Sequence, residues 1–420
     1  MYESCVASLR RRRFVVCRIV RHRELQRVSG KGFPKQRKGT IVAQDTADHQ
    51  FYLDDGSWII NYDAFGDRLE VHLIRRRSDA LQNREESYMK APWKRGISQS
   101  FVDDLCDGLL QPVLALSKAD DTLSLCVRNG YINIYYRGGS LLKIEEHGNH
   151  TYRFIFDPDY QKTKPNSYKL PSPDYGALPK NISSTNPSGL AVWIANIPLL
   201  KCAMDIWFGQ HHKQEREFQQ LVERSNNCDY RTDYFACDIE YTHPDCTELR
   251  ADILAIRWLS TQVARKKHDC ADLAIIEMKF RDGSLNSTTQ SAGLVDHVIK
   301  LRDAVHEGRV SFGDLAEEMR IIFNQRVKLG LVECHSEKGK IAKELTCING
   351  QHPQFILLLA DHDPDSRTLR NELTELLQIE QSGNLPFGLR VATANFMGYG
   401  LYDENIYPLS DFIKRFPDQI

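Results

Sequence analysis

The sequence lacks three features that mark common classes of protein: a Cys-x-x-Cys pair, a long apolar run and an excess of positive charge. Its 11 cysteines stand at irregular spacing with no recognisable secretory signal peptide before them, which is typical of reduced thiols in a cytoplasm. No apolar run approaches the roughly 20 residues that a membrane-spanning helix needs. Because 55 Lys and Arg face 56 Asp and Glu, no overall positive field attracts phosphates. We therefore expect a cytoplasmic protein with no membrane partner.

Positive charge is nevertheless concentrated at the start of the chain. Residues 1–44 hold twelve Lys or Arg, including four consecutive arginines at 10–13, against two acidic residues. Short β-like runs follow at 39–42, 50–62 and 68–74, and the character of the sequence changes at Met89. We interpret residues 1–88 as a basic extension of uncertain order. It is either an addition upstream of the functional chain or a nucleic-acid-binding arm, although runs of arginine are more often solvated than bound.

Beyond Met89 the chain divides into three parts, as expected for 420 residues,. Apolar spacing between residues 101 and 114 predicts a helix, and runs between 122 and 156 predict antiparallel strands. Residues 89–160 are therefore interpreted as an α+β accessory domain. Pro, Ser, Asn and Lys dominate residues 161–187, so we place a linker or loop region over 161–205. Residues 206–420 form the third part.

The third part has an informative order of elements. A helix is predicted at 211–224, followed by strands at 234–241, 251–258 and 271–280. A helix at about 291–305, a helical region at 312–328, and strands at 355–360 and 389–395 complete it,. Helix, three strands, helix, strand is the skeleton of a small α/β (α+β) domain with a mixed sheet covered by helices.

Two charged residues stand inside the apolar strand at 271–280. Glu277 and Lys279 are two positions apart, so both side chains project from one face, while Met278 points to the opposite one. Charges in a buried strand cost free energy unless they are paired or bind a metal. The strand at 251–258 supplies a partner, because Asp252 lies beside Glu277 if the two strands form a hairpin.

Paired carboxylates with open coordination positions are typical of a Mg²⁺ or Mn²⁺ site, where waters and a phosphate oxygen complete the shell. The metal would polarise the phosphate and lower the pKa of a bound water. Lys279 would orient that water or offset the charge that develops on the phosphate. Without such a site, Glu277 and Lys279 are a salt bridge at the end of a strand, and Asp252 is a strand-start residue beside Arg250.

The same residues carry a resemblance to a known family. Asp252, followed 25 residues later by Glu277-Met278-Lys279 within this order of elements, resembles the PD-(D/E)xK nuclease superfamily, which includes many restriction enzymes and junction resolvases. Ala251 replaces the family's proline before the aspartate. The resemblance covers about residues 206–400 and implies a restriction-endonuclease-like core and endonuclease activity on DNA. It also implies that Asp252, Glu277 and the backbone carbonyl of Met278 hold the metal.

The resemblance adds three candidates, in the order Glu240, Gln290 and Glu217. Glu240 points from the first strand toward the site, and Gln290 stands where many members place a polar residue on the helix after the third strand. Glu217 on the first helix matches the extra acidic ligand of some members. A solvated helix face explains Gln290 and Glu217 equally well without any site.

Two other functions stay open beside the nuclease. One is a nuclease fold that no longer cuts and instead binds nucleic acid or a partner protein, although the retention of all three central residues argues against it. The other is a scaffold protein, which would leave the buried charges without a purpose. A second copy of the chain is a further candidate partner.

Overall fold

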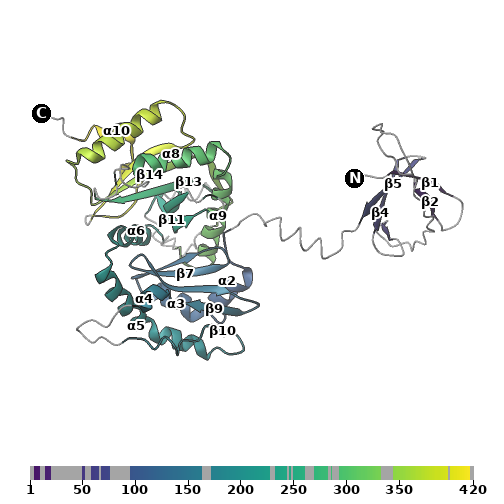
Figure 1. The fold of residues 1–420 in the computed structure, drawn as a ribbon, viewed down its shortest axis with the longest axis horizontal. Coiled ribbons are helices and arrows are strands. Elements are labelled where there is room, and N and C mark those ends of the chain that lie inside the picture. Colours follow the sequence, from purple (N-terminus) through teal and green to yellow (C-terminus); the bar gives the residue numbers. More distant parts are fainter. Residues whose placement is uncertain are drawn as a thin grey trace, which may run out of the picture. The chain divides into compact units, whose positions relative to one another are not determined.

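The structure is a computed structural model of the 420-residue chain. It divides into two compact units, Met1–Trp93 and Lys94–Ile420, both drawn in Figure 1. The residues that the structure describes are 4–9, 15–19, 50–52, 58–65, 68–75, 95–162, 172–227, 232–243, 246, 249–260, 269–281, 285, 293–332, 344–395 and 398–416.

The first unit contains a five-stranded antiparallel sheet in the order β2-β1-β5-β4-β3. Its strands are β1 (Ser4–Leu9), β2 (Val15–Ile19), β3 (Gln50–Tyr52), β4 (Trp58–Phe65) and β5 (Arg68–Arg75). The predicted runs at 50–62 and 68–74 correspond to β3, β4 and β5, whereas the run at 39–42 lies outside the described residues. Strands β1 and β2 were not predicted from the arginine-rich start. Apolar, largely β-branched residues favour a strand in β2, and the four consecutive arginines fall between the two strands.

The second unit begins with two helices, where the sequence predicted one between residues 101 and 114, and an antiparallel sheet. The helices are α2 (Gln99–Cys106) and α3 (Gln111–Ala119). The sheet has the order β10-β9-β8-β7-β6, and its strands are β6 (Leu123–Val127), β7 (Tyr131–Tyr136), β8 (Gly139–Glu146), β9 (Thr151–Ile155) and β10 (Asn181–Ser183). The short helix α4 (Pro158–Gln161) follows β9.

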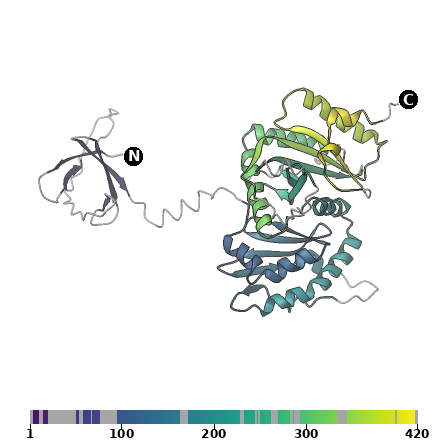
Figure 2. The same ribbon diagram turned by 180° about the vertical axis from the view of Figure 1, so that it is seen from behind.

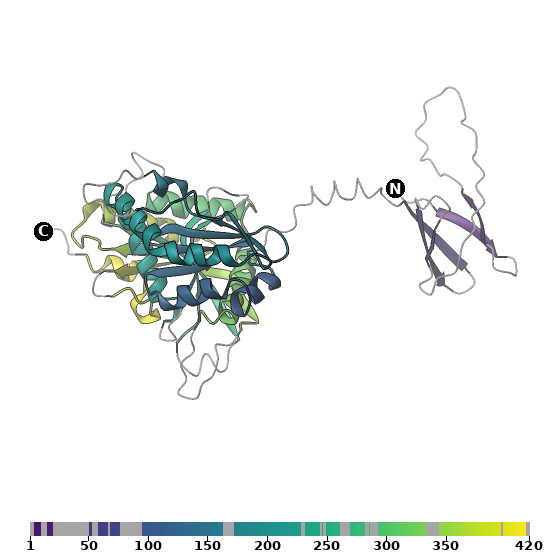
Figure 3. The same ribbon diagram turned by 90° about the horizontal axis from the view of Figure 1, so that it is seen from below.

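The linker expected at residues 161–205 is wrong over most of its described length. It contains β10 and most of α5 (Ser188–Gln210), a 23-residue helix. By length and composition α5 is apolar enough to cross a membrane, with a mean hydropathy of 1.4, so the expectation of no such run is also wrong. A core helix passes the same test, and one side of α5 packs on β8, β10 and α4 through buried residues such as Trp193 and Phe208. Figure 3 shows α5 running across this sheet.

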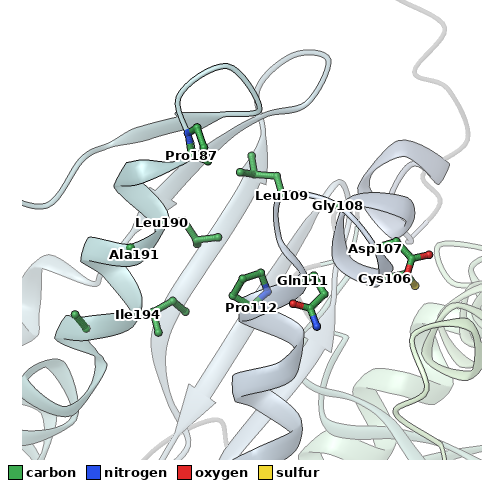
Figure 4. A pocket seen from close by; sticks show the side chains of 11 residues that line it. Cys106, Asp107, Gly108, Leu109, Gln111, Pro112, Pro187, Leu190, Ala191 and Ile194 are labelled. Carbon is green, nitrogen blue, oxygen red and sulfur yellow. The ribbon is translucent and has the colours of Figure 1, made fainter.

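A groove lies where the first half of α5 passes the turn between α2 and α3 (Figure 4). Its volume is about 810 Å³, and its lining is mainly apolar, with Leu109, Pro112, Leu190 and Ile194 among the lining residues. No residue of the charged strand pair lines it. The groove is therefore separate from the site that the sequence predicts.

The remaining elements build a six-stranded mixed sheet in the order β11-β12-β13-β14-β15-β16. Strands β11 to β13 are antiparallel, β13, β14 and β15 are parallel, and β15 pairs antiparallel with β16. The strands are β11 (Tyr234–Thr242), β12 (Arg250–Arg257), β13 (Cys270–Phe280), β14 (Cys347–Ala360), β15 (Gly388–Ala394) and β16 (Tyr407–Pro408). The helices are α6 (Gln214–Ser225), α8 (Leu294–His306), α9 (Phe312–Lys328), α10 (Arg367–Gln381) and α11 (Leu409–Ile413), and η1 (Asp403–Asn405) is a short 3-10 helix. The predicted mixed α+β architecture is confirmed, and only α10 and the elements after β15 were not predicted.

Helices α6 and α9 cover opposite faces of this sheet. Val222 of α6 belongs to one buried cluster with Ile276 and Met278 of β13. On the other face, Phe323 of α9 packs edge-on against Phe235 of β11, with ring centroids 5.6 Å apart. Figures 1 and 2 show α6 between the two sheets of the second unit.

A buried ion network connects the two sheets. Asp238 of β11 is fully buried and pairs with Arg95 and Arg128, and its Oδ1 lies 2.6 Å from Arg128 Nη1. Arg128 also donates to the backbone oxygen of Ile239. Residues 94–420 accordingly form a single compact unit, without the boundary that we expected within residues 161–205.

A disulfide connects the first residues of β13 and β14. Cys270 and Cys347 are partners in the parallel strand register, with their Cα atoms 4.7 Å apart. The expectation of reduced thiols is wrong for this pair. Irregular spacing could not show the pairing, because the two residues are 77 positions apart and meet only when the parallel strands align.

Candidate active site

Asp252 and Glu277 meet where strands β12 and β13 separate. The last backbone pair of this antiparallel ladder joins Ile253 to Ile276, so the next residues outward are Asp252 and Glu277. The Oδ2 atom of Asp252 accepts a hydrogen bond from the backbone N–H of Met278 at 2.7 Å. This hydrogen bond bridges the point where the ladder ends and holds the aspartate carboxylate against β13.

Strand periodicity separates the charges of β13 from its core residues. The side chain of Met278 is fully buried in the cluster under α6, so Glu277 and Lys279 project from the other face. Lys279 Nζ lies 2.6 Å from Glu277 Oε1, and the two side chains are only 5% and 4% exposed. The two residues do form a salt bridge at the end of a strand, as the alternative expected, but the pair is buried rather than exposed. Burying both charges is costly unless further groups compensate them.

Burial and repulsion disfavour the ionised carboxylates. Burial raises the pKa of Glu277 to about 7, with Glu215 and Glu240 adding to the shift and Lys279 opposing it. Burial and the nearby Glu277 raise the pKa of Asp252 well above its ordinary value. For Lys279, burial lowers the pKa, but Glu277 and Asp252 outweigh burial and the net shift is upward. The cluster is therefore acidic and favours a bound cation.

Helix α6 contributes Glu215 to the cluster. Its Oε2 accepts a hydrogen bond from the backbone N–H of Phe280 at 3.3 Å, and its charge raises the pKa of both Asp252 and Glu277. The predicted helix residue, Glu217, instead forms an ion pair with Arg137 at 2.9 Å. The structure thus brings Glu215 to the site, and Glu217 to the turn between β7 and β8.

Of the two predicted residues Glu240 and Gln290, the structure describes only Glu240. Glu240 lies close enough for its charge to raise the pKa of Glu277, and its Oε1 is 3.4 Å from Arg216 Nε on α6. Its φ of 51° is unusual for a residue other than glycine and marks a local distortion of β11. Gln290 lies outside the described residues.

Two further residues that the sequence did not reveal contact the cluster. His297, on the first turn of α8, places Nδ1 3.2 Å from Glu277 Oε1. Gln219, a buried residue of α6, donates to the backbone oxygen of Asp252. Neither lies near Asp252 or Glu277 in sequence, so only the packing of the two helices could identify them.

The donor set fits a hard divalent cation that keeps much of its water. Asp252 and Glu277 are the central pair, and Glu215 adds a third carboxylate charge to the same region. Among the described residues, no group of three or more His, Cys, Asp or Glu is placed so that it could hold a metal ion, so a cation here would depend on water and substrate for its other ligands. Mg²⁺ is commonly bound by one or two carboxylates, with waters and substrate phosphate as its other ligands.

Comparison with known proteins adds no assignment. No family model, no curated protein and no solved structure matches the chain. The site is therefore interpreted from its own geometry.

Proposed function

We propose that this chain is a metal-dependent endonuclease that hydrolyses phosphodiester bonds in DNA with Mg²⁺ or Mn²⁺. The observation that carries the proposal is the meeting of Asp252 with the buried pair Glu277 and Lys279 at the end of one strand ladder. Glu277 and Lys279 are buried beside a third charged group, and buried charges are costly to keep. Binding a cation and stabilising a phosphate would explain why the protein keeps these charges.

Each residue of the cluster has a distinct role in this proposal. Asp252 and Glu277, with the backbone carbonyl of Met278, would hold the metal, and Glu215 would supply additional negative charge. The metal would polarise the phosphate and lower the pKa of a bound water. Lys279 is held in place by its contact with Glu277, and its ammonium group would offset the charge that develops on the phosphate.

Local cations supply the attraction that the net charge does not. Arg216 follows Glu215 on α6, Arg281 follows the last residue of β13, and their side chains are 47% and 63% exposed. Both pair with a carboxylate, Glu240 and Asp361 respectively, and a phosphate backbone would compete for them. A restriction-endonuclease-like core belongs to the same proposal. So does a cytoplasmic location, which rests on five described cysteines being free thiols beside the one disulfide of the described residues.

A nuclease fold that binds nucleic acid without cutting is the second candidate. It predicts a parent protein that binds duplex DNA but leaves it intact with either metal. Retention of a buried lysine against a buried carboxylate favours the enzyme, because a binding surface needs exposed cations rather than buried ones.

Lys279→Ala tests the proposal. Losing one group that stabilises the transition state costs about 10²–10³ in rate, so cleavage of a labelled duplex with Mg²⁺ should fall at least that far. Duplex affinity should change little. Cleavage is compared at saturating Mg²⁺, because Lys279 also contacts Glu277 Oε1 and its loss should also weaken metal binding. Lys414→Ala is the matched control, because it removes a lysine from an exposed ion pair with Asp411 and should cut at the parental rate.

Two results would contradict the proposal in different ways. Parental cleavage by Lys279→Ala removes the assigned mechanism. A parent that binds the duplex but never cuts it, with Mg²⁺ or with Mn²⁺, supports the binding module instead.

A further inference from the structure

We infer that His297 is a positioning residue that fixes the carboxylate of Glu277 for metal binding. The inference rests on the proposed function and extends it to a helix that the family resemblance did not identify. It depends on where one imidazole nitrogen lies, not on the titration of the ring.

Helix α8 delivers His297 to the buried side of the fold. Leu294, Val298 and Leu301 are almost fully buried, and His297 stands three positions after Leu294 and four before Leu301. Residues at this spacing share a helix face. The core packing of α8 therefore directs the imidazole toward the sheet, and its side chain is 22% exposed.

The contact is specific to one oxygen of Glu277. His297 Nδ1 is 3.2 Å from Oε1, and Lys279 Nζ is 2.6 Å from the same atom. With the proton on Nδ1, the imidazole donates to the carboxylate. Two donors that approach one oxygen from different elements fix the plane of the carboxylate and the direction of its other oxygen.

Fixing a ligand in this way has a measurable effect on metal affinity. Hydrogen bonds from outside the coordination shell orient metal-binding carboxylates, and their loss costs about 10–100-fold in affinity or activity. Lys279 alone cannot fix the carboxylate plane, because a flexible four-carbon stem carries its single ammonium. His297 is a rigid ring on a packed helix and supplies the second direction.

Three substitutions at this position separate positioning from simple packing. In His297→Asn the side-chain amide nitrogen takes nearly the place of Nδ1 and still donates, whereas in His297→Gln it takes nearly the place of Nε2. His297→Ala removes the donor. His306→Ala is the control, because His306 is an exposed residue at the last turn of the same helix.

The measurement is Mn²⁺ binding to the full chain by isothermal titration calorimetry, at one pH and without nucleic acid, with the melting temperature of each variant recorded beside it. His297→Ala and His297→Gln should weaken Mn²⁺ binding about 10-fold or more. His297→Asn should stay within roughly threefold of the parent, since it restores the donor. His306→Ala should match the parent.

The outcomes distinguish this inference from the proposed function. If the parent binds Mn²⁺ and His297→Ala binds it equally well, the inference is overturned while the metal site stands. If His297→Asn is as weak as His297→Ala although both melt like the parent, the role of the Nδ1 donor is likewise refuted. A parent that does not bind Mn²⁺ overturns the metal-dependent function, and the inference with it.

Discussion

The raised pKa of Glu277 predicts that this carboxyl group lowers the stability of the metal-free protein as the pH rises. Burial moves the pKa from 4.5 to about 7 on folding. Below pH 4.5 the group is protonated in both states and costs nothing. Between the two values the folded state keeps a proton that the unfolded state releases, so raising the pH favours unfolding. Above about pH 7 the loss is complete.

The size of the effect follows from the shift. A difference of about 2.5 units between 4.5 and 7, at about 1.36 kcal/mol per unit, corresponds to about 3 kcal/mol of unfolding free energy. The side chain is only 4% exposed, so solvent screens little of it. The charge of Glu277 also raises the pKa of Asp252, and removing that charge should weaken the pH dependence of stability further.

Glu277→Gln tests this effect by urea denaturation in chelator, at intervals from pH 5 to pH 8. The amide still accepts a hydrogen bond from Lys279 but cannot ionise. The variant should gain about 2–3 kcal/mol relative to the parent between these pH values. Glu217→Gln makes the same change at a half-buried carboxylate paired with Arg137 and controls for the substitution itself. If the profiles of Glu277→Gln and the parent run parallel, the buried carboxyl has no such effect and the reasoning fails.

Two further predictions concern the frame around the site. Asp238→Ala leaves the buried Arg95 and Arg128 without their carboxylate and should lower the unfolding free energy by about 3–5 kcal/mol in urea denaturation; a loss under 1 kcal/mol would mean that the network adds little. Reducing the Cys270–Cys347 disulfide, which closes a loop of 77 residues, should cost about 2–4 kcal/mol, and Cys270→Ser should show no response to reductant. A parent that is equally stable with and without reductant would contradict this.

The central strands could be predicted from the sequence because local patterns determine them. The apolar run at 271–280 is long enough to indicate a buried strand, and it corresponds to β13. The period of two placed Glu277 and Lys279 on one face, and a hairpin between consecutive strands placed Asp252 near them. The register then placed Asp252 and Glu277 next to each other, just beyond the last backbone pair of Ile253 with Ile276.

The segment around α5 could not be predicted in this way. The residues before Ser188 are rich in Pro, Ser and Asn, which indicates a loop, and the predicted loop was extended into the helix that follows. The helix itself is apolar on nearly all sides and contains Pro198, so it shows neither the amphipathic stripe of a surface helix nor an uninterrupted helical sequence. The disulfide was hidden for a related reason, because a parallel register joins residues that are distant in the sequence.

The acidic helix residue of the site could not be identified correctly from the sequence pattern. Some members of the family have an acidic residue on the first helix, and we assigned this role to Glu217, although Glu215 stands two positions earlier. Two positions along a helix rotate a side chain by about 200°, so only one of them can face β13. Which one does so depends on how α6 docks, and the hydrogen bond from the Phe280 amide selects Glu215, while Arg137 holds Glu217 on the other side. The rotation of a helix about its axis is set by tertiary packing. For a site that combines a strand with a helix, the sequence pattern therefore predicts the strand residues but not the helix residue.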